Sequence, residues 1–291
     1  MEKCYLCPRN CGTDRAAGEL GFCREGDSIR IARYSLHMWE EPLISGKRGS
    51  GTIFFSGCNL KCEFCQNRVI SHGSKGESIS VERLCEIMLE LQSMGAENIN
   101  LVTPTHFADK IAEALREVKK DLSIPVVYNT SSYEKVDTLR MLDGLVDIYL
   151  PDYKYFSDEL ALKYSFAKDY RMIAEAAIAE MFRQTGSVLI ENGIMKKGII
   201  IRHLVLPSCR RDSIAVLERI SELLPKDNIL VSVMSQYTPE FAIKADTKHK
   251  ELRRAITSFE YSSVSERAIS LGLDGFFQEK SSATSEYTPD F

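Results

Sequence analysis

The sequence has little of what would place a protein in a membrane, on a nucleic acid or outside the cell. No apolar run approaches the roughly 20 residues that a membrane helix needs, so we expect no membrane span. The 37 lysines and arginines do not outnumber the 41 aspartates and glutamates, and the net charge of -4 provides no basic patch for a nucleic acid. The first residues, Met1 to Cys4, lack the apolar core of a signal peptide, so we expect a cytoplasmic protein.

Cysteine, in contrast, is abundant and gathered in two short stretches. Of the nine cysteines, four lie between positions 4 and 23 and three lie between positions 58 and 65. In a secreted protein this number would suggest disulfides, but spacing this tight is typical of metal ligands and indicates a reducing compartment. The two remaining cysteines, Cys85 on the apolar stripe of a predicted helix and Cys209 after a predicted strand, are interpreted as structural.

The second group consists of Cys58, Cys62 and Cys65, directly after the apolar run 52–55. Three thiolates separated by three and then two residues fit on one tight loop and can hold three corners of a cubane iron–sulfur cluster. A fourth cysteine is not evident nearby, so one iron would stay open for a small chelating molecule. The alternative is a structural zinc loop, which normally needs four closed ligands. We therefore predict a 4Fe-4S cluster at these three catalytic cysteines.

The first group consists of Cys4, Cys7, Cys11 and Cys23. Four thiolates within twenty residues can close a tetrahedral zinc site or hold a second iron–sulfur cluster, and the spacing leaves both open. A segment this short cannot bury a core of its own, so a metal would supply its fold. We predict a second metal site here, packed against the rest of the protein.

The rest of the chain alternates between short apolar runs and amphipathic stretches. The runs are apolar on both sides, as buried parallel strands are, and the stretches repeat apolar residues at helical spacing. This pattern predicts an α/β fold, a partial (β/α)6 TIM-like barrel over residues 49–291, preceded by a small cysteine-rich metal-binding segment over residues 1–48. Segments 262–278 and 281–291 receive no assignment. The predicted strands are 52–55, 99–102, 125–128, 146–150, 199–206 and 229–234, and the predicted helices are 80–91, 108–120, 133–142, 157–183 and 211–224.

Polar residues follow nearly every predicted strand. In barrels of this kind the chemistry gathers at the C-terminal ends of the strands, so these residues should share one rim with the cysteine loop. Each alone could be a solvated loop residue or a satisfied core group, but their coincidence favours a site. The set contains Thr103, Thr105 and His106 after the second strand, Asn129, Thr130 and Ser131 after the third, Asp152 and Lys154 after the fourth, Arg202 and His203 in the fifth, and Ser235, Gln236 and Tyr237 after the sixth.

The loop Cys-x3-Cys-x2-Cys, with Phe64 before its last cysteine, resembles the signature of the radical S-adenosylmethionine (SAM) superfamily. That resemblance implies that the open iron binds the amino and carboxylate groups of SAM. It also implies that one electron from the reduced cluster cleaves SAM to methionine and a 5′-deoxyadenosyl radical.

A closer resemblance extends over nearly the whole chain. The Cys-x2-Cys-Pro-Arg-x-Cys-Gly start and the stretches 37–42, 49–58, 103–106, 201–207 and 234–239 resemble uncharacterised iron–sulfur proteins related to the pyruvate formate-lyase activating enzymes. Those enzymes lack the N-terminal cysteines and have a Gly-Gly-Glu type turn where this chain has residues 103–106. The resemblance places Lys154 near the SAM carboxylate and Tyr237 on the adenine. It implies that SAM is bound by Phe64, Thr103, Thr105, Asn129, Asp152, Lys154, Arg202 and Tyr237.

Two functions remain open at this stage. The first is a radical enzyme, similar to a glycyl-radical-enzyme activase, that abstracts hydrogen from a glycine of a partner protein or peptide. Its partners would include a reduced flavodoxin-like or ferredoxin-like electron donor. The second is an iron–sulfur or zinc protein that serves electron transfer or scaffolding without cleaving SAM. The polar strand ends favour the first, because a pure electron carrier does not need a cradle of carboxylates and cations.

Overall fold

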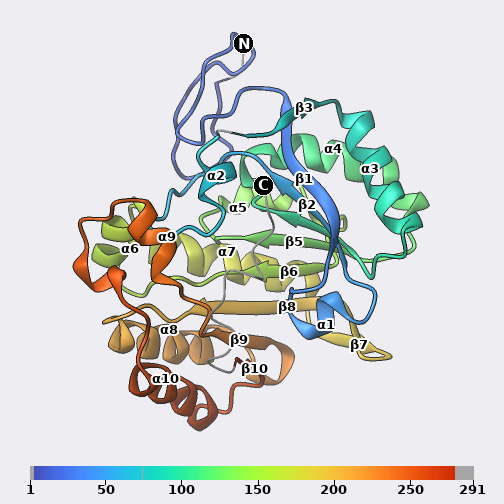
Figure 1. The fold of residues 1–291 in the computed structure, drawn as a ribbon. Coiled ribbons are helices and arrows are strands. Elements are labelled where there is room, and N and C mark those ends of the chain that lie inside the picture. Colours follow the sequence, from blue (N-terminus) through green and yellow to red (C-terminus); the bar gives the residue numbers. More distant parts are fainter. Residues whose placement is uncertain (1–2, 74, 279–291) are drawn as a thin grey trace.

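The computed structural model describes residues 3–73 and 75–278, whose strands form one curved sheet (Figure 1). The strand order is β10-β9-β8-β6-β5-β4-β2-β1-β3, and β7 pairs with β8 outside this path. Neighbours from β2 to β10 pair in parallel, whereas β1 pairs antiparallel with β2 and β3, and β7 with β8. The bounds are β1 Ile29–His37, β2 Ser50–Phe55, β3 Glu77–Ile79, β4 Ile99–Val102, β5 Val126–Thr130, β6 Ile148–Pro151, β7 Leu189–Glu191, β8 Ile194–Leu204, β9 Leu230–Met234 and β10 Gly275–Phe277.

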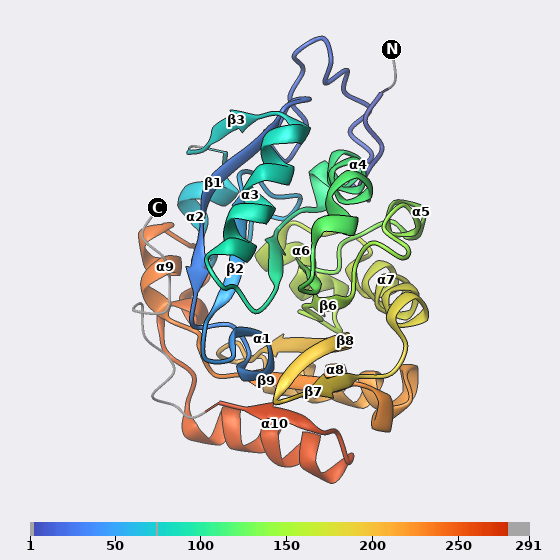
Figure 2. The same cartoon turned by 90° about the vertical axis from the view of Figure 1, so that its right-hand side faces the viewer.

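Helices cover the convex side of the sheet, as the view along the strands shows for α3, α4 and α7 (Figure 2). Local chemistry sets their ends: Ser80 caps α3 by accepting from the backbone of Arg83, and Thr257 with Glu260 forms a capping box on α10. In the described part of the chain, none of these helices is long and apolar enough to cross a membrane. The α-helices are α1 Pro42–Ser45, α2 Arg68–Ser71, α3 Val81–Ser93, α4 Ala108–Val118, α5 Val136–Arg140, α6 Asp158–Ser165, α7 Tyr170–Thr185, α8 Arg210–Leu223, α9 Pro239–Lys244 and α10 Ser258–Ser270, with short 3-10 turns η1 Thr105–Phe107, η2 Lys119–Asp121, η3 Lys226–Asn228 and η4 Lys250–Arg253.

The predicted α/β architecture is confirmed. All six predicted strands exist, as β2, β4, β5, β6, β8 and β9, and the sheet is largely parallel. The sequence did not reveal β1, although it lies in the segment 1–48 and pairs with β2. The unassigned segment 262–278 contains most of α10 and all of β10, and the tail 281–291 lies outside the described residues.

The single helix predicted over residues 157–183 is wrong. The chain forms two helices there, α6 and α7. Phe166 ends α6 with a φ of 53°, and Asp169 precedes α7 with a φ of 54°. Both angles lie in the left-handed region, where a right-handed helix cannot continue. Neither position is Gly or Pro, so the break could not be predicted from the residue types there.

The short helix α1 fills the concave side of the sheet at the N-terminal ends of the strands. Ile44 is fully buried there, in a cluster with Val127 of β5, Ile148 and Leu150 of β6, and Ile200 of β8. Figure 2 shows α1 inside the curve of the sheet. Beneath β5, β6 and β8 the floor of the lumen, the space inside the curve of the sheet, is therefore apolar, and the polar ends of these strands lie at its opposite end.

Glu134, in the loop between β5 and α5, ties the ends of β4 and β5 together. The hydroxyls of Thr105 and Thr130 both donate to Glu134 Oε1 at 2.6 Å. Burial raises the pKa of this carboxyl to about 7, and the hydrogen bonds from the threonines only reduce the shift. Thr105 therefore hydrogen-bonds to the carboxyl group of Glu134, a structural contact behind the strand ends.

Replacing Ile44 with Ala should destabilise the protein. The change removes buried methyl groups from the floor of the lumen and leaves a cavity, so the free energy of unfolding should fall by about 2–5 kcal/mol in urea titrations. Ile269→Ala is the matched control, because this α10 side chain is 63% exposed. Equal stability of the two variants would show that α1 does not anchor the lumen.

The free energy of unfolding should depend on pH because of Glu134. The folded protein keeps a proton on Glu134 that the unfolded chain loses above its ordinary pKa of 4.5, so stability should fall as the pH rises from about 4.5 to about 7. Glu134→Gln cannot ionise, and urea unfolding at about pH 5 and about pH 8 should show a smaller loss than in the wild type. The exposed Glu266→Gln should keep the wild-type loss. An unchanged loss in Glu134→Gln would contradict the assignment.

Candidate active site

On β5, β6 and β8, the inner face of the sheet changes from apolar to polar toward the C-terminal ends of the strands. Every second residue of a strand faces the same side, so Val127 is followed inward by Asn129, and Ile200 by Arg202. These polar ends open into a cavity of ≈ 260 Å³. Its lining includes His37, Trp39, Glu40, Cys58, Cys62, Phe64, Cys65, Gln66, Thr103, Asn129, Ser131, Asp152, Lys154, Arg202, Met234 and Gln236.

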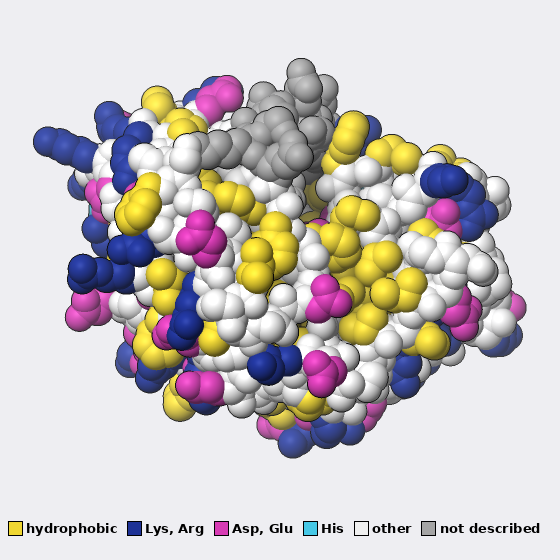
Figure 3. Space-filling view, turned by 90° about the horizontal axis from the view of Figure 1, so that it is seen from below, with side chains coloured by type: hydrophobic (Ala, Val, Ile, Leu, Met, Phe, Trp, Pro, Cys, Tyr) yellow, Lys and Arg dark blue, Asp and Glu magenta, His cyan; other side chains and the backbone are white. Residues whose placement is uncertain are grey.

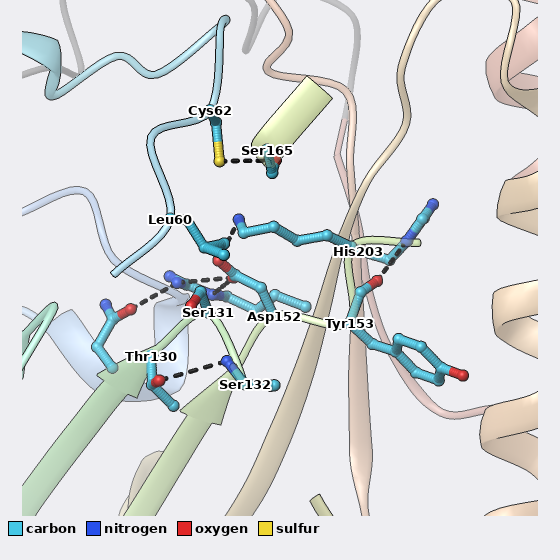
Figure 4. A network of polar contacts seen from close by, with 12 residues as sticks. Leu60, Cys62, Thr130, Ser131, Ser132, Asp152, Tyr153, Ser165 and His203 are labelled. Carbon is cyan, nitrogen blue, oxygen red and sulfur yellow. Dashed lines mark hydrogen bonds and ion pairs between the residues drawn. The ribbon is translucent and has the colours of Figure 1, made fainter. Parts of the chain in front are cut away.

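The loop after β2 brings three thiols to this cavity. The Ser165 hydroxyl lies 2.9 Å from Cys62 Sγ (Figure 4). The Ser71 hydroxyl lies 3.4 Å from Cys65 Sγ. Burial raises the pKa of the Cys58 and Cys65 thiols, and the nearby Cys62 raises both further, whereas Lys154 lowers them. The three thiols are therefore close enough to influence one another, and ionising them requires positive charge in the cavity.

This donor set fits a cubane cluster. Its three thiols come from one loop, and the described lining of the cavity holds no fourth cysteine. Across residues 3–73 and 75–278, no three His, Cys, Asp or Glu side chains are arranged to hold a metal ion as they stand. A cubane spans several iron and sulfur atoms, so its ligands do not have to converge on one point as the ligands of zinc do.

A compact network of charges lies beneath the cysteine loop (Figure 4). Asp152 accepts hydrogen bonds from Arg202 Nε at 2.9 Å and from Lys154 Nζ at 2.7 Å. Arg202 also donates to Asn129 Oδ1 at 2.6 Å and contacts a Glu40 oxygen at 3.4 Å. Burial opposes ionisation of Asp152, but the two cations outweigh it and hold the pKa of this carboxyl below its usual value.

Both cations are themselves buried and stay charged because of Asp152. Burial lowers the pKa of Lys154 and of Arg202, but the neighbouring carboxylate overcomes it, and both values end above the ordinary ones. Lys154 lines the same cavity as Cys62, and this thiol also raises the pKa of the Lys154 ammonium. The arrangement thus holds two fixed cations next to three thiols, where an anionic group of a ligand can bind.

Most residues predicted to bind SAM do line the cavity. The structure brings together Phe64, Thr103, Asn129, Asp152, Lys154 and Arg202 with the three cysteines. Two predicted residues lie outside the described lining. Thr105 faces Glu134. Tyr237 is 2% exposed and donates to the Leu252 carbonyl, and its ring centre lies 6.0 Å from that of Phe64 in an edge-to-face arrangement.

The sequence prediction missed the contribution of the loop between β1 and α1. His37, Trp39 and Glu40 line the cavity from a segment that precedes the barrel strands. Glu40 accepts from Asn129 Nδ2 at 3.3 Å as well as from Arg202. The stretch of aromatic and acidic residues before Pro42 was the available signal, but its position before the first predicted strand gave no reason to place it at the strand ends.

The four N-terminal cysteines also meet in the structure. Cys4, Cys7, Cys11 and Cys23 line a second, much smaller cavity of ≈ 10 Å³, together with the Arg9 and Arg15 side chains and with His106. Cys7 and Cys23 are buried, and Cys11 is exposed. The prediction that they share one metal centre stays a prediction, which their common cavity favours.

Comparison with known proteins agrees with this geometry. Residues 52–231 match the model of the radical SAM superfamily. An uncharacterised protein of Methanocaldococcus jannaschii is 32% identical over 285 residues, which cover 94% of this chain and 76% of that protein.

Solved structures show the same fold at low sequence identity. A double mutant of spore photoproduct lyase, with bound AdoMet and dinucleoside spore photoproduct, has a TM-score of 0.54 at 10% identity, over 80% of this chain and 78% of that one. SuiB of Streptococcus suis, bound to the precursor peptide SuiA, has a TM-score of 0.51 at 15% identity, over 76% of this chain but only 46% of SuiB. Because the family model covers more than half of its length, this chain belongs to the radical SAM superfamily.

Proposed function

We propose that this protein is an activase-like radical SAM oxidoreductase that abstracts a hydrogen atom from a glycine of a protein or peptide. The observation that carries the proposal is the meeting of three thiols from one loop with Asp152, Lys154 and Arg202 in one cavity. Membership of the superfamily implies SAM cleavage at an iron–sulfur cluster. The finer statement, a protein or peptide glycine as target, rests on the resemblance to activating-enzyme relatives.

Some residues of the cavity would hold the cofactors, and others would orient them. When bound, the cluster supplies the electron that breaks a carbon–sulfur bond of SAM. Cys58, Cys62 and Cys65 would hold it as thiolates. Lys154 would bind the carboxylate of SAM, while Asp152 keeps that lysine charged and in place. Phe64 and the polar ends Thr103 and Asn129 would line the rest of the SAM site.

A large substrate fits the shape of the sheet. In the described residues the strand path has two ends, β10 and β3, so the barrel does not close on itself. Trp39 is 57% exposed and lies on the wall of the cavity, where it can contact a bound chain. Lysine, arginine and acidic side chains are interspersed on the face seen in Figure 3, without a large basic patch suited to a nucleic acid. We propose a reduced flavodoxin-like or ferredoxin-like donor and a cytoplasmic location.

The alternative function, electron transfer or scaffolding without SAM cleavage, leaves the charge network unexplained. Buried cations held over a paired carboxylate cost desolvation energy, and a protein that only carries electrons gains nothing from them. A role in binding SAM or a substrate explains why these cations lie next to the cysteine loop, where one iron of the cluster would stay open.

Replacing Cys62 with Ala should abolish both cluster binding and SAM cleavage. The variant loses one of three ligands, so the visible absorption of this cluster should disappear. After anaerobic incubation with dithionite and SAM, 5′-deoxyadenosine should form with the wild type and not with the variant. Cys85→Ala is the control, because Cys85 lies on α3 and its thiol contacts the Ala114 carbonyl instead of the cavity. Cleavage retained by Cys62→Ala would sink the proposal.

Replacing Lys154 with Ala should weaken SAM binding at unchanged iron content. A charge-assisted hydrogen bond contributes about 1.5–3 kcal/mol, which corresponds to roughly tenfold or more in the dissociation constant. Titration of the reconstituted protein with SAM measures the change. Lys119→Ala is the matched control, since Lys119 also pairs with an aspartate, Asp147, but lies outside the described lining of the cavity. If both variants bind SAM like the wild type, Lys154 does not contact the cofactor.

A further inference from the structure

The N-terminal cysteines form a site with two different sides. Cys7 and Cys23 are buried against the barrel, whereas Cys11 is exposed and Cys4 is half-buried. The backbone N–H of Phe22 donates to Cys11 Sγ at 3.3 Å, as amides do to metal-bound thiolates. A metal group held by the four thiols would thus have one edge in solvent and the other against the protein.

The buried edge touches the loop that carries the first cysteine set. Gly57, next to Cys58, has a φ of +78°, and a Cβ at this position would lie 2.7 Å from the Cys23 carbonyl oxygen. Only glycine permits this backbone conformation together with so close an approach. The backbone of Cys23 therefore lies directly against the backbone of Gly57, the residue before Cys58.

Arg9 connects the two sets through a second path. Its Nε donates to the Asn59 carbonyl, one residue after Cys58, at 2.7 Å. Its Nη2 donates to the Ser165 carbonyl at 3.4 Å, and the hydroxyl of the same serine lies 2.9 Å from Cys62 Sγ. Since Arg9 also lines the N-terminal cavity, one side chain links that cavity to the cysteine loop.

Arg15 indicates that the N-terminal cavity is built for an anionic group. This side chain is 8% exposed and lines the cavity. Its two terminal nitrogens contact the His106 carbonyl at 2.7 Å and Cys23 Sγ at 3.6 Å, while its buried Nε has no partner. A buried cation needs an opposing charge, and a centre with four thiolate ligands carries a net negative one.

We propose that Cys4, Cys7, Cys11 and Cys23 hold a second iron–sulfur cluster that passes electrons to the first. The inference rests on the proposed SAM cleavage, which needs one electron in each cycle. A reduced flavodoxin-like or ferredoxin-like protein is oxidised at the exposed Cys11 edge, and the second cluster is reduced. That cluster is then oxidised as one electron crosses the Cys23–Gly57 contact and reduces the first cluster. Zinc has no redox chemistry and would gain nothing from this adjacency.

Metal analysis of the anaerobically reconstituted protein is the first test. Two cubanes require about eight irons per chain and no zinc, and Cys11→Ser should retain about four. Cys85→Ser, outside both sets, should keep the full iron content. About four irons with one zinc in the wild type would overturn the proposal, as would about four irons with the four N-terminal thiols open to alkylation.

The source of the electron is the second test. With reduced flavodoxin, 5′-deoxyadenosine formation should be lost in Cys11→Ser and kept in Cys85→Ser. With a small photoreductant that can reach the first cluster directly, both variants should cleave SAM like the wild type. Equal flavodoxin-driven cleavage in Cys11→Ser and the wild type would refute the relay.

The two proposals fail in distinguishable ways. If the wild type forms no 5′-deoxyadenosine with any reductant, SAM cleavage is refuted. The second cluster is then still tested by iron content and by spectroscopic reduction, which should take up two electrons per chain in the wild type and one in Cys11→Ser.

Discussion

The buried ion pairs of Asp152 hold the side chains at the C-terminal ends of the strands in place. One carboxylate accepts from Arg202 of β8 and from Lys154 after β6, and a β-bridge joins the backbones of Asp152 and Arg202. Removing one partner of a buried pair leaves an unpaired charge and typically costs about 3–5 kcal/mol, so these side chains have little freedom. Because the cations are fixed before any ligand arrives, they present a preorganised binding surface next to the cysteine loop.

On β5, β6 and β8, strand alternation directs apolar residues to the floor of the lumen and polar residues to its rim. Ile148 and Leu150 face inward with Asp152, while Tyr149 between them packs toward the helices on the convex side. Ile44 of α1 fills the floor, and the loop that leads into α1 therefore brings Glu40 to the charge network. This segment lies outside the barrel strands, yet it contributes to both the floor and the rim of the lumen.

The strands could be predicted because short runs that are apolar on both sides are typical of buried parallel strands. The three cysteines of the loop could be predicted because their spacing is local. The side to which each residue points was harder to predict at the end of β9, because a shift of one residue changes the face of the sheet. Gln236 lines the cavity there and Tyr237 packs behind it. Glu40 could not be predicted because its place depends on how a distant loop enters the lumen. The helix break at Phe166 left no signal, since neither Gly nor Pro stands there and the Phe166 carbonyl accepts from Arg9, a residue far away in the sequence.

The helix α1 also determines how the cavity exchanges its contents. With Ile44 fully buried at the N-terminal ends of the strands, α1 blocks that end of the lumen, and the cavity opens instead among the cysteine loop and the strand ends. A small molecule bound against Arg202 would lie deeper than a larger molecule bound at the mouth of the cavity. The smaller one would then have to enter first, and it could leave only after the larger one.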